Sequence, residues 1–256
     1  YDGQIVSFEW NFGDNQQGNG KIIDHEFTQE GIYTVRLIVT DDETKQGIAN
    51  KKITVDNTGK AGLVLHLLLD GDFSDQSGKN HAFECGINVG CPDFVAGKKN
   101  QGIASDGTST GKYVRILYQP DLDGFAAFSL ALWAKKNNAV GGTLATKSDS
   151  YHLKINQNSV EAYVQNAAGQ RASLLQTIQL IDNTDWHYYA LTYNGAMVKL
   201  FVDGQEIASK PFSGTVAAQP DFDLRLLKNM WGNTINGTID EVRLYDLPLT
   251  PAQVLD

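Results

Sequence analysis

The stretch DWHYYALTYNGAMVKLFVDGQ, residues 185–205, combines alternating apolar side chains with two turn signals, and this combination decides the fold. Asn194-Gly195 is a strong signal for a two-residue hairpin loop, because a type I′ turn needs positive φ at both central positions. Asp203-Gly204 gives a second tight turn. We therefore predict antiparallel strands here rather than a helix.

Alternation along these strands separates an apolar face from a mixed one, since successive side chains of a strand point to opposite faces. Tyr189, Leu191 and Tyr193 share the apolar face. Tyr188 and Thr192 share the mixed face. Packing therefore accounts for most of the aromatic residues in this stretch, without a ligand.

The same pattern of short strands covers the rest of the chain. After residue 62, apolar runs such as KYVRILY, FSLALWAKK and GTIDEVRLY recur between turn residues, with no helical period between them. This spacing is typical of a β-sandwich or barrel. Residues 1–55 show another set of alternating runs, and DNTGKAG at residues 56–62 lacks bulky apolar residues, as a linker does. Two all-β domains are expected.

Composition excludes several classes of function. The chain has 256 residues, 41% of them hydrophobic, which suffices for one large β domain and a small one. A net charge of −9 and a pI near 5.0 disfavour nucleic-acid binding, which normally requires a basic patch. No apolar run reaches the about 18 residues that a membrane-spanning helix needs. We expect no nucleic-acid partner and no membrane span.

The two cysteines, Cys85 and Cys91, bracket a loop that contains glycine and is short enough to form a small ring. No histidine or cysteine pair nearby completes a zinc-ligand set. We predict a disulfide, and with it an oxidising compartment. Two free thiols are the alternative.

Two families resemble parts of this sequence. The segments DWHYYALTYNGAMVKLFVDGQEIA, GTIDEVRLYDLPLTPAQV, FSLALWAKK and LLLDGDFSDQSGKNHA resemble the signature segments of laminin-G-like, concanavalin-A-like jelly-roll domains of secreted bacterial proteins. DGQIVSFEWNFGD and HEFTQEGIYTVRLIVTDD resemble a polycystic-kidney-disease (PKD) domain, an immunoglobulin-like sandwich. Such domains usually have a first strand before the D-G, which this sequence lacks.

The expected architecture is all-β: a small Ig-like (PKD) sandwich without its first strand at residues 1–57, a linker at 58–62, and a concanavalin-like β-jelly-roll sandwich at 63–256. The resemblance implies a non-catalytic carbohydrate-binding module of a larger secreted or cell-surface bacterial protein. We therefore expect an extracellular location, other domains in a longer parent chain, and a polysaccharide partner, for which an acidic polymer is one candidate.

Catalysis competes with this interpretation, because glycosidases and polysaccharide lyases also occur on the concanavalin-like fold. Retaining hydrolysis needs two carboxylates about 5–5.5 Å apart, and the matching spacing is absent, since Asp240 and Glu241 point to opposite faces. A lyase set of Tyr163, Gln165 and Arg171 stays open. A structural spacer or protein-binding adhesion module is the other alternative.

Acidic residues gather among glycines in DGDFSDQSGKNH, residues 70–81, and hard oxygen ligands suit Ca²⁺. The segment is not an EF-hand loop, because no Glu closes it. In the resembled family, a structural calcium is often held near the end of the first strand and by the Asp of the closing strand. On that resemblance Asp70 and Asp240 are the expected ligands, with Asp72 as a weaker third. The alternative is that these aspartates cap turns.

A sugar site needs exposed aromatic rings that stack on pyranose faces, with polar or cationic neighbours. Alternation places these candidates on outer faces: Trp133, His152, Lys154, Tyr163 and Arg225. Trp231 lies in the Gly- and Asn-containing loop KNMWGNT and has no periodic reason to be buried, which makes it the best single candidate. Tyr151, beside KSDS, is the next. A spacer would instead cover these rings.

Overall fold

The computed structural model describes residues 3–25, 27, 31–55, 62–137, 141–178, 185–251 and 253–255. The chain divides into two compact units, Tyr1–Ala61 and Gly62–Asp256. Of the predicted linker, only Gly62 is among the described residues. No helix in the described part of the chain is long and apolar enough to cross a membrane.

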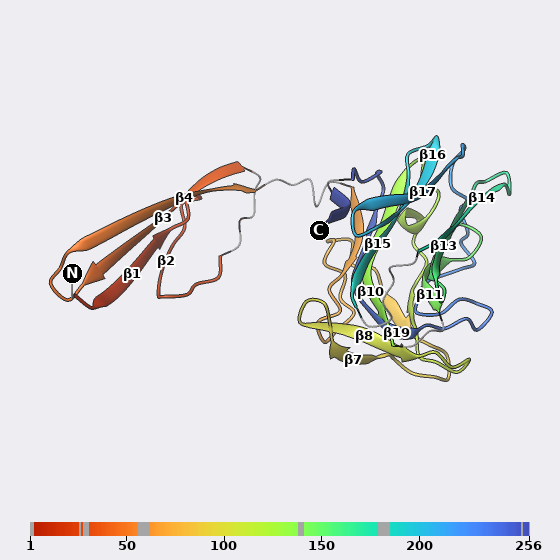
Figure 1. Ribbon diagram of the computed structural model, residues 1–256, viewed down its shortest axis with the longest axis horizontal. Coiled ribbons are helices and arrows are strands. Elements are labelled where there is room, and N and C mark those ends of the chain that lie inside the picture. The colour runs from red at the N-terminus through yellow and green to blue at the C-terminus, as the bar shows by residue number, and fades with distance from the viewer. Residues whose placement is uncertain are drawn as a thin grey trace. The chain divides into compact units, whose positions relative to one another are not determined.

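The first unit contains one antiparallel sheet with the strand order β2-β1-β3-β4 (Figure 1). Its strands are β1 (Ile5–Asn11), β2 (Gln17–Asn19), β3 (Gly31–Asp41) and β4 (Gln46–Val55). Val35 is buried and Ile32 is exposed, so β3 has one core face and one solvent face, as alternation requires. Trp10, Val35 and Leu37 line an apolar groove of about 210 Å³ on that face. A second layer of the expected sandwich is not among the described residues.

The second unit is a sandwich of two antiparallel sheets (Figure 1). The larger sheet has the order β17-β16-β15-β10-β19-β8-β7, with β5 also paired to β19. It contains β5 (Leu63–Leu67), β7 (Asp93–Ala96), β8 (Gln101–Asp106), β10 (Phe128–Lys136), β15 (His187–Tyr193), β16 (Met197–Val202), β17 (Gln205–Pro211) and β19 (Asn236–Tyr245).

The smaller sheet has the order β14-β13-β12-β11-β18-β9-β6. It contains β6 (Phe83–Cys85), β9 (Val114–Ile116), β11 (Gly142–Lys147), β12 (Tyr151–Ile155), β13 (Ser159–Gln165), β14 (Arg171–Thr177) and β18 (Leu224–Leu226). Two short 3₁₀ helices complete the unit, η1 (Pro120–Leu122) and η2 (Gln253–Leu255). The all-β, two-domain prediction agrees with this architecture.

The stretch 185–205 contributes to two cores rather than to a binding surface. Tyr189, Leu191 and Tyr193 are fully buried between the two sheets. Tyr188 lies on the other face of the larger sheet and is also buried, in a smaller cluster with Leu249 from the C-terminal segment. Both faces of the β15–β16 hairpin are therefore occupied by packing.

The hairpin turns differ from the prediction at one of the two sites. At Asn194-Gly195 only Gly195 has positive φ, so the predicted type I′ turn is wrong there. Asn194 Oδ1 instead accepts the N–H groups of Ala196 and Met197, because an Asn side chain can bond to the backbone two residues on. The loop Asp203-Gly204 has φ of 49° and 76°, the positive pair that a type I′ turn requires.

Candidate functional site

Four of the residues predicted for a sugar site lie on the outer face of the smaller sheet. Tyr163 pairs with His152, His152 with Thr146, and Thr146 with Arg225, which makes one row across four strands. Lys154 lies on the same face and contacts Glu161 at 3.4 Å. Alternation therefore predicted the direction of these side chains, because their strand neighbours face the core.

Neighbouring side chains cover Tyr163, which lies at one end of this row. The His152 ring stacks on the Tyr163 ring with centroids 5.2 Å apart, and the Arg171 guanidinium lies 4.0 Å from the Tyr163 centroid. His152 and Tyr163 are only 6% and 8% exposed. Burial lowers the pKa of His152 to about 4, so the ring is neutral at pH 7. The expectation of an exposed Tyr163 is wrong, because residues of two adjacent strands lie against it.

The arginines on this face have partners of their own. Arg115 pairs with Glu84 and with Asp223, and Arg171 pairs with Asp149 at 3.0 Å. The Arg225 guanidinium lies over the ring of Tyr113, 5.5 Å from its centroid. The charges of Arg115 and Arg171 are therefore balanced by carboxylates, whereas Arg225 is held against an aromatic ring.

Tyr151 is a core residue, so its predicted place in a sugar site is wrong. The side chain is fully buried, its ring packs against Phe128, and its hydroxyl donates to the Leu122 carbonyl at 2.7 Å. Tyr151 shares a face of β12 with Leu153 and Ile155, both in the core. Strict alternation from those two residues would have placed Tyr151 inside.

Trp133 lies on the outer face of the larger sheet, partly covered. Its ring is 5.2 Å from that of Tyr188, and Lys98 Nζ lies 4.2 Å from its centroid. The indole Nε1 is buried and finds no hydrogen-bond partner in the described part of the chain. The Trp133 ring is therefore partly covered by other side chains and does not offer an open face to a sugar.

Trp231 is the predicted residue that the structure leaves open, with 75% of its surface exposed. It lies in the loop between β18 and β19, next to the exposed Met230. Asn229 Oδ1 accepts the N–H groups of Trp231 and Asn233 at 3.0 and 2.9 Å, which holds the loop in shape. The indole is thus displayed to solvent on an ordered loop.

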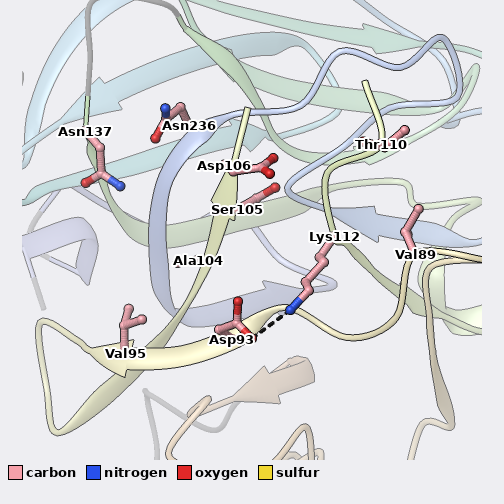
Figure 2. Close-up of a pocket in the computed structure, with 10 residues that line it drawn as sticks. All are labelled: Val89, Asp93, Val95, Ala104, Ser105, Asp106, Thr110, Lys112, Asn137 and Asn236. Atoms are coloured by element: carbon pink, nitrogen blue, oxygen red, sulfur yellow. Dashed lines mark hydrogen bonds and ion pairs between the residues drawn. The ribbon is translucent and has the colours of Figure 1, made fainter. Parts of the chain in front are cut away.

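A cleft of about 440 Å³, here called the end cleft, lies at one end of the second unit (Figure 2). It is bounded by β7, β8, the start of β19, the disulfide loop and the segment 107–113. Its lining residues are Val89, Asp93, Val95, Ala104, Ser105, Asp106, Thr110, Lys112, Asn137 and Asn236. This lining is rich in carboxylates, amides and hydroxyls, the groups that orient a polar ligand.

Ser105 contributes a buried hydroxyl without a described hydrogen-bond partner to the lining of the end cleft. It lies on the same face of β8 as Ile103, a core residue, so its side chain is on the interior side of the sheet. The side chain is 7% exposed, and its hydroxyl has no hydrogen-bond partner among the residues described. Figure 2 shows the Ser105 and Asp106 side chains pointing toward the segment that carries Thr110 and Lys112.

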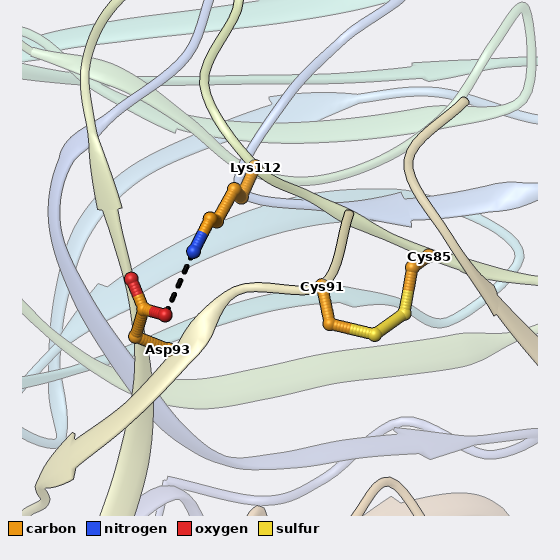
Figure 3. Close-up of a disulfide and its surroundings, with 4 residues drawn as sticks. All are labelled: Cys85, Cys91, Asp93 and Lys112. Carbon is orange, nitrogen blue, oxygen red and sulfur yellow. Dashed lines mark hydrogen bonds and ion pairs between the residues drawn. A yellow bond between two sulfur atoms is a disulfide. The ribbon is translucent and has the colours of Figure 1, made fainter. Parts of the chain in front are cut away.

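The predicted disulfide between Cys85 and Cys91 is present and closes the loop that contributes Val89 to the end cleft (Figure 3). Two residues beyond Cys91, Asp93 pairs with Lys112 at 2.7 Å. The disulfide and this ion pair therefore fix two sides of the cleft wall.

The Trp231 loop borders the segment 107–113 that forms part of this wall. Lys228 Nζ donates a hydrogen bond to the Ser109 carbonyl at 2.5 Å. A side chain at Gly111 would collide with Thr234, with its Cβ 2.7 Å from the Thr234 methyl group. The residues that flank the Trp231 loop, Lys228 and Thr234, thus lie against a segment of the cleft wall.

Comparison with known proteins agrees with this architecture. Residues 106–255 match the Concanavalin A-like lectin/glucanases superfamily. The chain belongs to this superfamily. Residues 1–56 match the PKD domain, so the first unit of this superfamily member is a PKD domain, as the resemblance predicts.

Two curated relatives of this superfamily member are bacterial collagenases. Collagenase ColA of Clostridium perfringens (strain 13 / Type A) is 39% identical over 54 residues, which are 21% of this chain and 5% of that protein. Collagenase ColQ1 of Bacillus cereus (strain Q1) is 23% identical over 171 residues, 60% of this chain and 16% of that protein. The chain thus spans a small part of each relative.

Solved structures share the jelly-roll fold of the superfamily. Domain 4 of AbnA, a GH43 extracellular arabinanase from Geobacillus stearothermophilus in complex with arabinotriose, superimposes with a TM-score of 0.61 at 22% identity, covering 77% of this chain and 98% of that chain. The binding domain of Paraclostridial Mosquitocidal Protein 1 gives a TM-score of 0.62 at 15% identity, covering 77% and 51%. Identities this low show the fold alone.

The calcium prediction depends chiefly on Asp240. Its Oδ1 is buried without a hydrogen-bond partner among the described residues, and burial raises the Asp240 pKa to about 6. Both oxygens of Asp70 already accept hydrogen bonds, from Asn100 and Gln101, and Asp72 Oδ1 accepts the N–H of Ser74.

In the described part of the chain, no group of three or more His, Cys, Asp or Glu side chains could hold an ion. A Ca²⁺ ion at the Asp240 carboxylate would therefore need carbonyl, amide or water oxygens as its other ligands, which Ca²⁺ accepts. Calcium stays a prediction.

The residues that line the end cleft were not among the site residues predicted from the sequence. Asp93, Ser105 and Asn236 come from three different strands, β7, β8 and β19. They meet because β8 pairs with both β7 and β19. No motif links them along the chain, and only the strand order could have brought them together.

Proposed function

We propose that this chain is a non-catalytic carbohydrate-binding module of a larger secreted bacterial protein. The observation that carries the proposal is the exposed Trp231 on an ordered loop beside the polar end cleft. An indole face offers apolar area at little entropic cost, and convergent polar groups fix the orientation of a ligand. Domain 4 of the arabinanase, whose fold this chain shares, is in complex with arabinotriose.

The extracellular part of the proposal has two supports. The Cys85–Cys91 disulfide suits an oxidising environment. The arabinanase that contains the matched domain is extracellular, and the chain matches parts of two bacterial collagenases. A module attached to a larger degradative enzyme would hold that enzyme near its polymeric substrate.

The proposal does not extend to acidic polysaccharides. Arg115 and Arg171, which would attract uronic acids on the smaller sheet, are paired with carboxylates. Each of these ion pairs balances the charge of its arginine and so weakens the attraction of that arginine for a ligand carboxylate.

Polysaccharide cleavage is the less favoured alternative. His152, Tyr163 and Arg171 do come together, with Gln165 accepting a hydrogen bond from Arg171 Nη2 at 2.7 Å. However, the His152 and Tyr163 side chains are buried against each other, and a general base must reach the proton that it removes. This arrangement supports a packing role.

A screen by affinity gel electrophoresis tests the proposal. The purified chain is run through gels that contain plant and algal polysaccharides, with and without EDTA. Retardation by at least one polymer is expected, and Trp231→Ala should reduce it. If no polymer retards the chain, the function as a spacer or protein-binding adhesion module replaces this proposal.

A further inference from the structure

The residues that line the end cleft carry more negative than positive charge. Asp93 and Asp106 contribute carboxylates, and Lys112 is the one cationic side chain among the ten lining residues. Lys112 Nζ already pairs with Asp93 at 2.7 Å. Two carboxylates and one ammonium leave the lining with a net charge of −1.

The Asp106 carboxylate is held in place at the wall of the cleft. Its Oδ1 accepts hydrogen bonds from the backbone N–H and the hydroxyl of Thr108, at 2.9 and 2.8 Å. These hydrogen bonds lower the pKa of Asp106, so the group is ionised at neutral pH. An ionised acceptor forms stronger hydrogen bonds to ligand hydroxyl groups than a neutral one.

Ser105 adds an independent sign that a ligand enters. Its buried hydroxyl has no partner in the described residues, and a buried polar group without a hydrogen bond costs free energy that a ligand hydroxyl would recover. The Gly111 backbone packs close to this hydroxyl, since a Cβ there would lie 2.8 Å from Ser105 Oγ. Ser105 therefore has unused hydrogen-bonding capacity in the wall of the end cleft.

We infer, on the basis of the proposed carbohydrate function, that the end cleft binds a neutral sugar unit, with Ser105 Oγ and the Asp106 carboxylate as direct partners. Sugar hydroxyls donate to Asp106 and exchange hydrogen bonds with Ser105. A uronic acid or sulfated sugar would bring its negative charge against Asp93 and Asp106, with the single cation already paired, and like charges at an interface suppress binding. The Trp231 loop would contact the polymer beyond the cleft.

Calorimetric titration of the whole chain with two sets of soluble polymers tests this inference. The neutral set is arabinan, galactan, xylan and β-glucan, and the acidic set is polygalacturonate and alginate. At least one neutral polymer should bind, and both acidic polymers should not. Ser105→Ala and Asp106→Asn should each weaken the neutral polymer by about tenfold, as expected for a lost hydrogen bond with a buried or charged partner.

Two matched variants serve as controls. Ser173→Ala and Asp221→Asn make the same chemical changes at exposed residues outside the end cleft and should leave affinity unchanged. Ser105→Ala removes a hydroxyl that has no partner, so its melting temperature should equal or exceed that of the wild type. A thermal melt of each variant therefore separates loss of binding from loss of folding.

The outcomes distinguish this inference from the proposed function. Binding of acidic polymers alone would overturn the inference and leave the carbohydrate function standing. Neutral binding that survives both cleft variants would also overturn it, since the cleft would then not be the site. Failure to bind any polymer would overturn the proposed function itself.

Discussion

Asp70 and Asp240 accept hydrogen bonds from the same turn, which joins β7 to β8. Asp240 Oδ2 accepts the N–H groups of Lys98 and Lys99, both at 2.8 Å, and Asp70 Oδ2 accepts a hydrogen bond from the Asn100 side-chain amide at 3.0 Å. The segment after the first strand of the second unit and its closing strand are thus tied to one turn. This is the place where the family resemblance predicts calcium, and backbone N–H groups already occupy part of it.

Calcium binding here would stabilise the second unit by neutralising the buried Asp240. At a free Ca²⁺ concentration about 100 times the dissociation constant, mass action contributes about 2.7 kcal/mol. For a domain of this size that corresponds to a rise in melting temperature of roughly 5–10 °C. Scanning calorimetry with Ca²⁺ and with excess EDTA measures the difference in melting temperature. Identical melting temperatures would show that the second unit does not bind a stabilising calcium ion.

His81 makes the stability of the second unit depend on pH. Its Nδ1 lies 2.7 Å from Asp75 and its Nε2 lies 2.9 Å from Asp121. Burial alone would lower the pKa of His81, but the hydrogen bonds to Asp75 and Asp121 outweigh it and raise the pKa above 6.5. The protonated ring therefore stabilises the fold below the unfolded pKa of about 6.5, and this stabilisation is lost as pH rises through the folded pKa.

Urea unfolding between pH 5 and pH 9 measures this effect. The free energy of unfolding should fall on the alkaline side in the wild type and stay flatter in His81→Asn. His152 gives the opposite trend, because its pKa of about 4 means that protonation opposes folding as pH drops below 6.5. A maximum of stability near pH 6.5 is expected, and an equal alkaline slope in His81→Asn would contradict the role of His81.

Reduction of the Cys85–Cys91 disulfide should weaken both stability and binding. The bond closes a short loop with a sequence separation of 6, for which chain entropy predicts about 2 kcal/mol of stabilisation. Val89 and Asp93 line the end cleft within and just beyond this loop. Cys85→Ser with Cys91→Ser should therefore lower the melting temperature by several degrees and reduce polymer affinity. A lower melting temperature with unchanged affinity would show that the loop does not shape the binding site.

Strand alternation predicted the cores well because the period of two is directly coupled to burial. Tyr189 and Leu191 are inside, and Val35 marks the core face of the PKD domain. Alternation predicts which face of the sheet a side chain points to, but not whether neighbouring side chains cover it. Tyr163 points outward as predicted, yet Arg171 from the next strand lies against it, and that contact depends on a strand pairing that the sequence does not state.

The end cleft was beyond prediction for a related reason. Asp106 and Asn236 face each other only because β8 and β19 pair in this register. Trp231 could be predicted, since a loop of Gly and Asn residues offers no periodic reason for burial, whereas Tyr151 was misplaced because its neighbours in sequence are polar. For a residue at the end of a strand, alternation with the strand's core residues thus predicts burial better than the polarity of the neighbouring loop.

Trp231→Ala tests whether the exposed indole contributes binding energy. Because the side chain is 75% exposed, its removal should leave the melting temperature almost unchanged, as surface substitutions usually do. If the ring stacks on a sugar, affinity for a retained polymer should fall by about 1–3 kcal/mol, the range for aromatic stacking and interface anchors. Leu175→Ala removes another exposed apolar side chain, on the smaller sheet, and should leave binding as it is. Equal losses in the two variants would mean that exposed apolar area in general, rather than the Trp231 ring, holds the polymer.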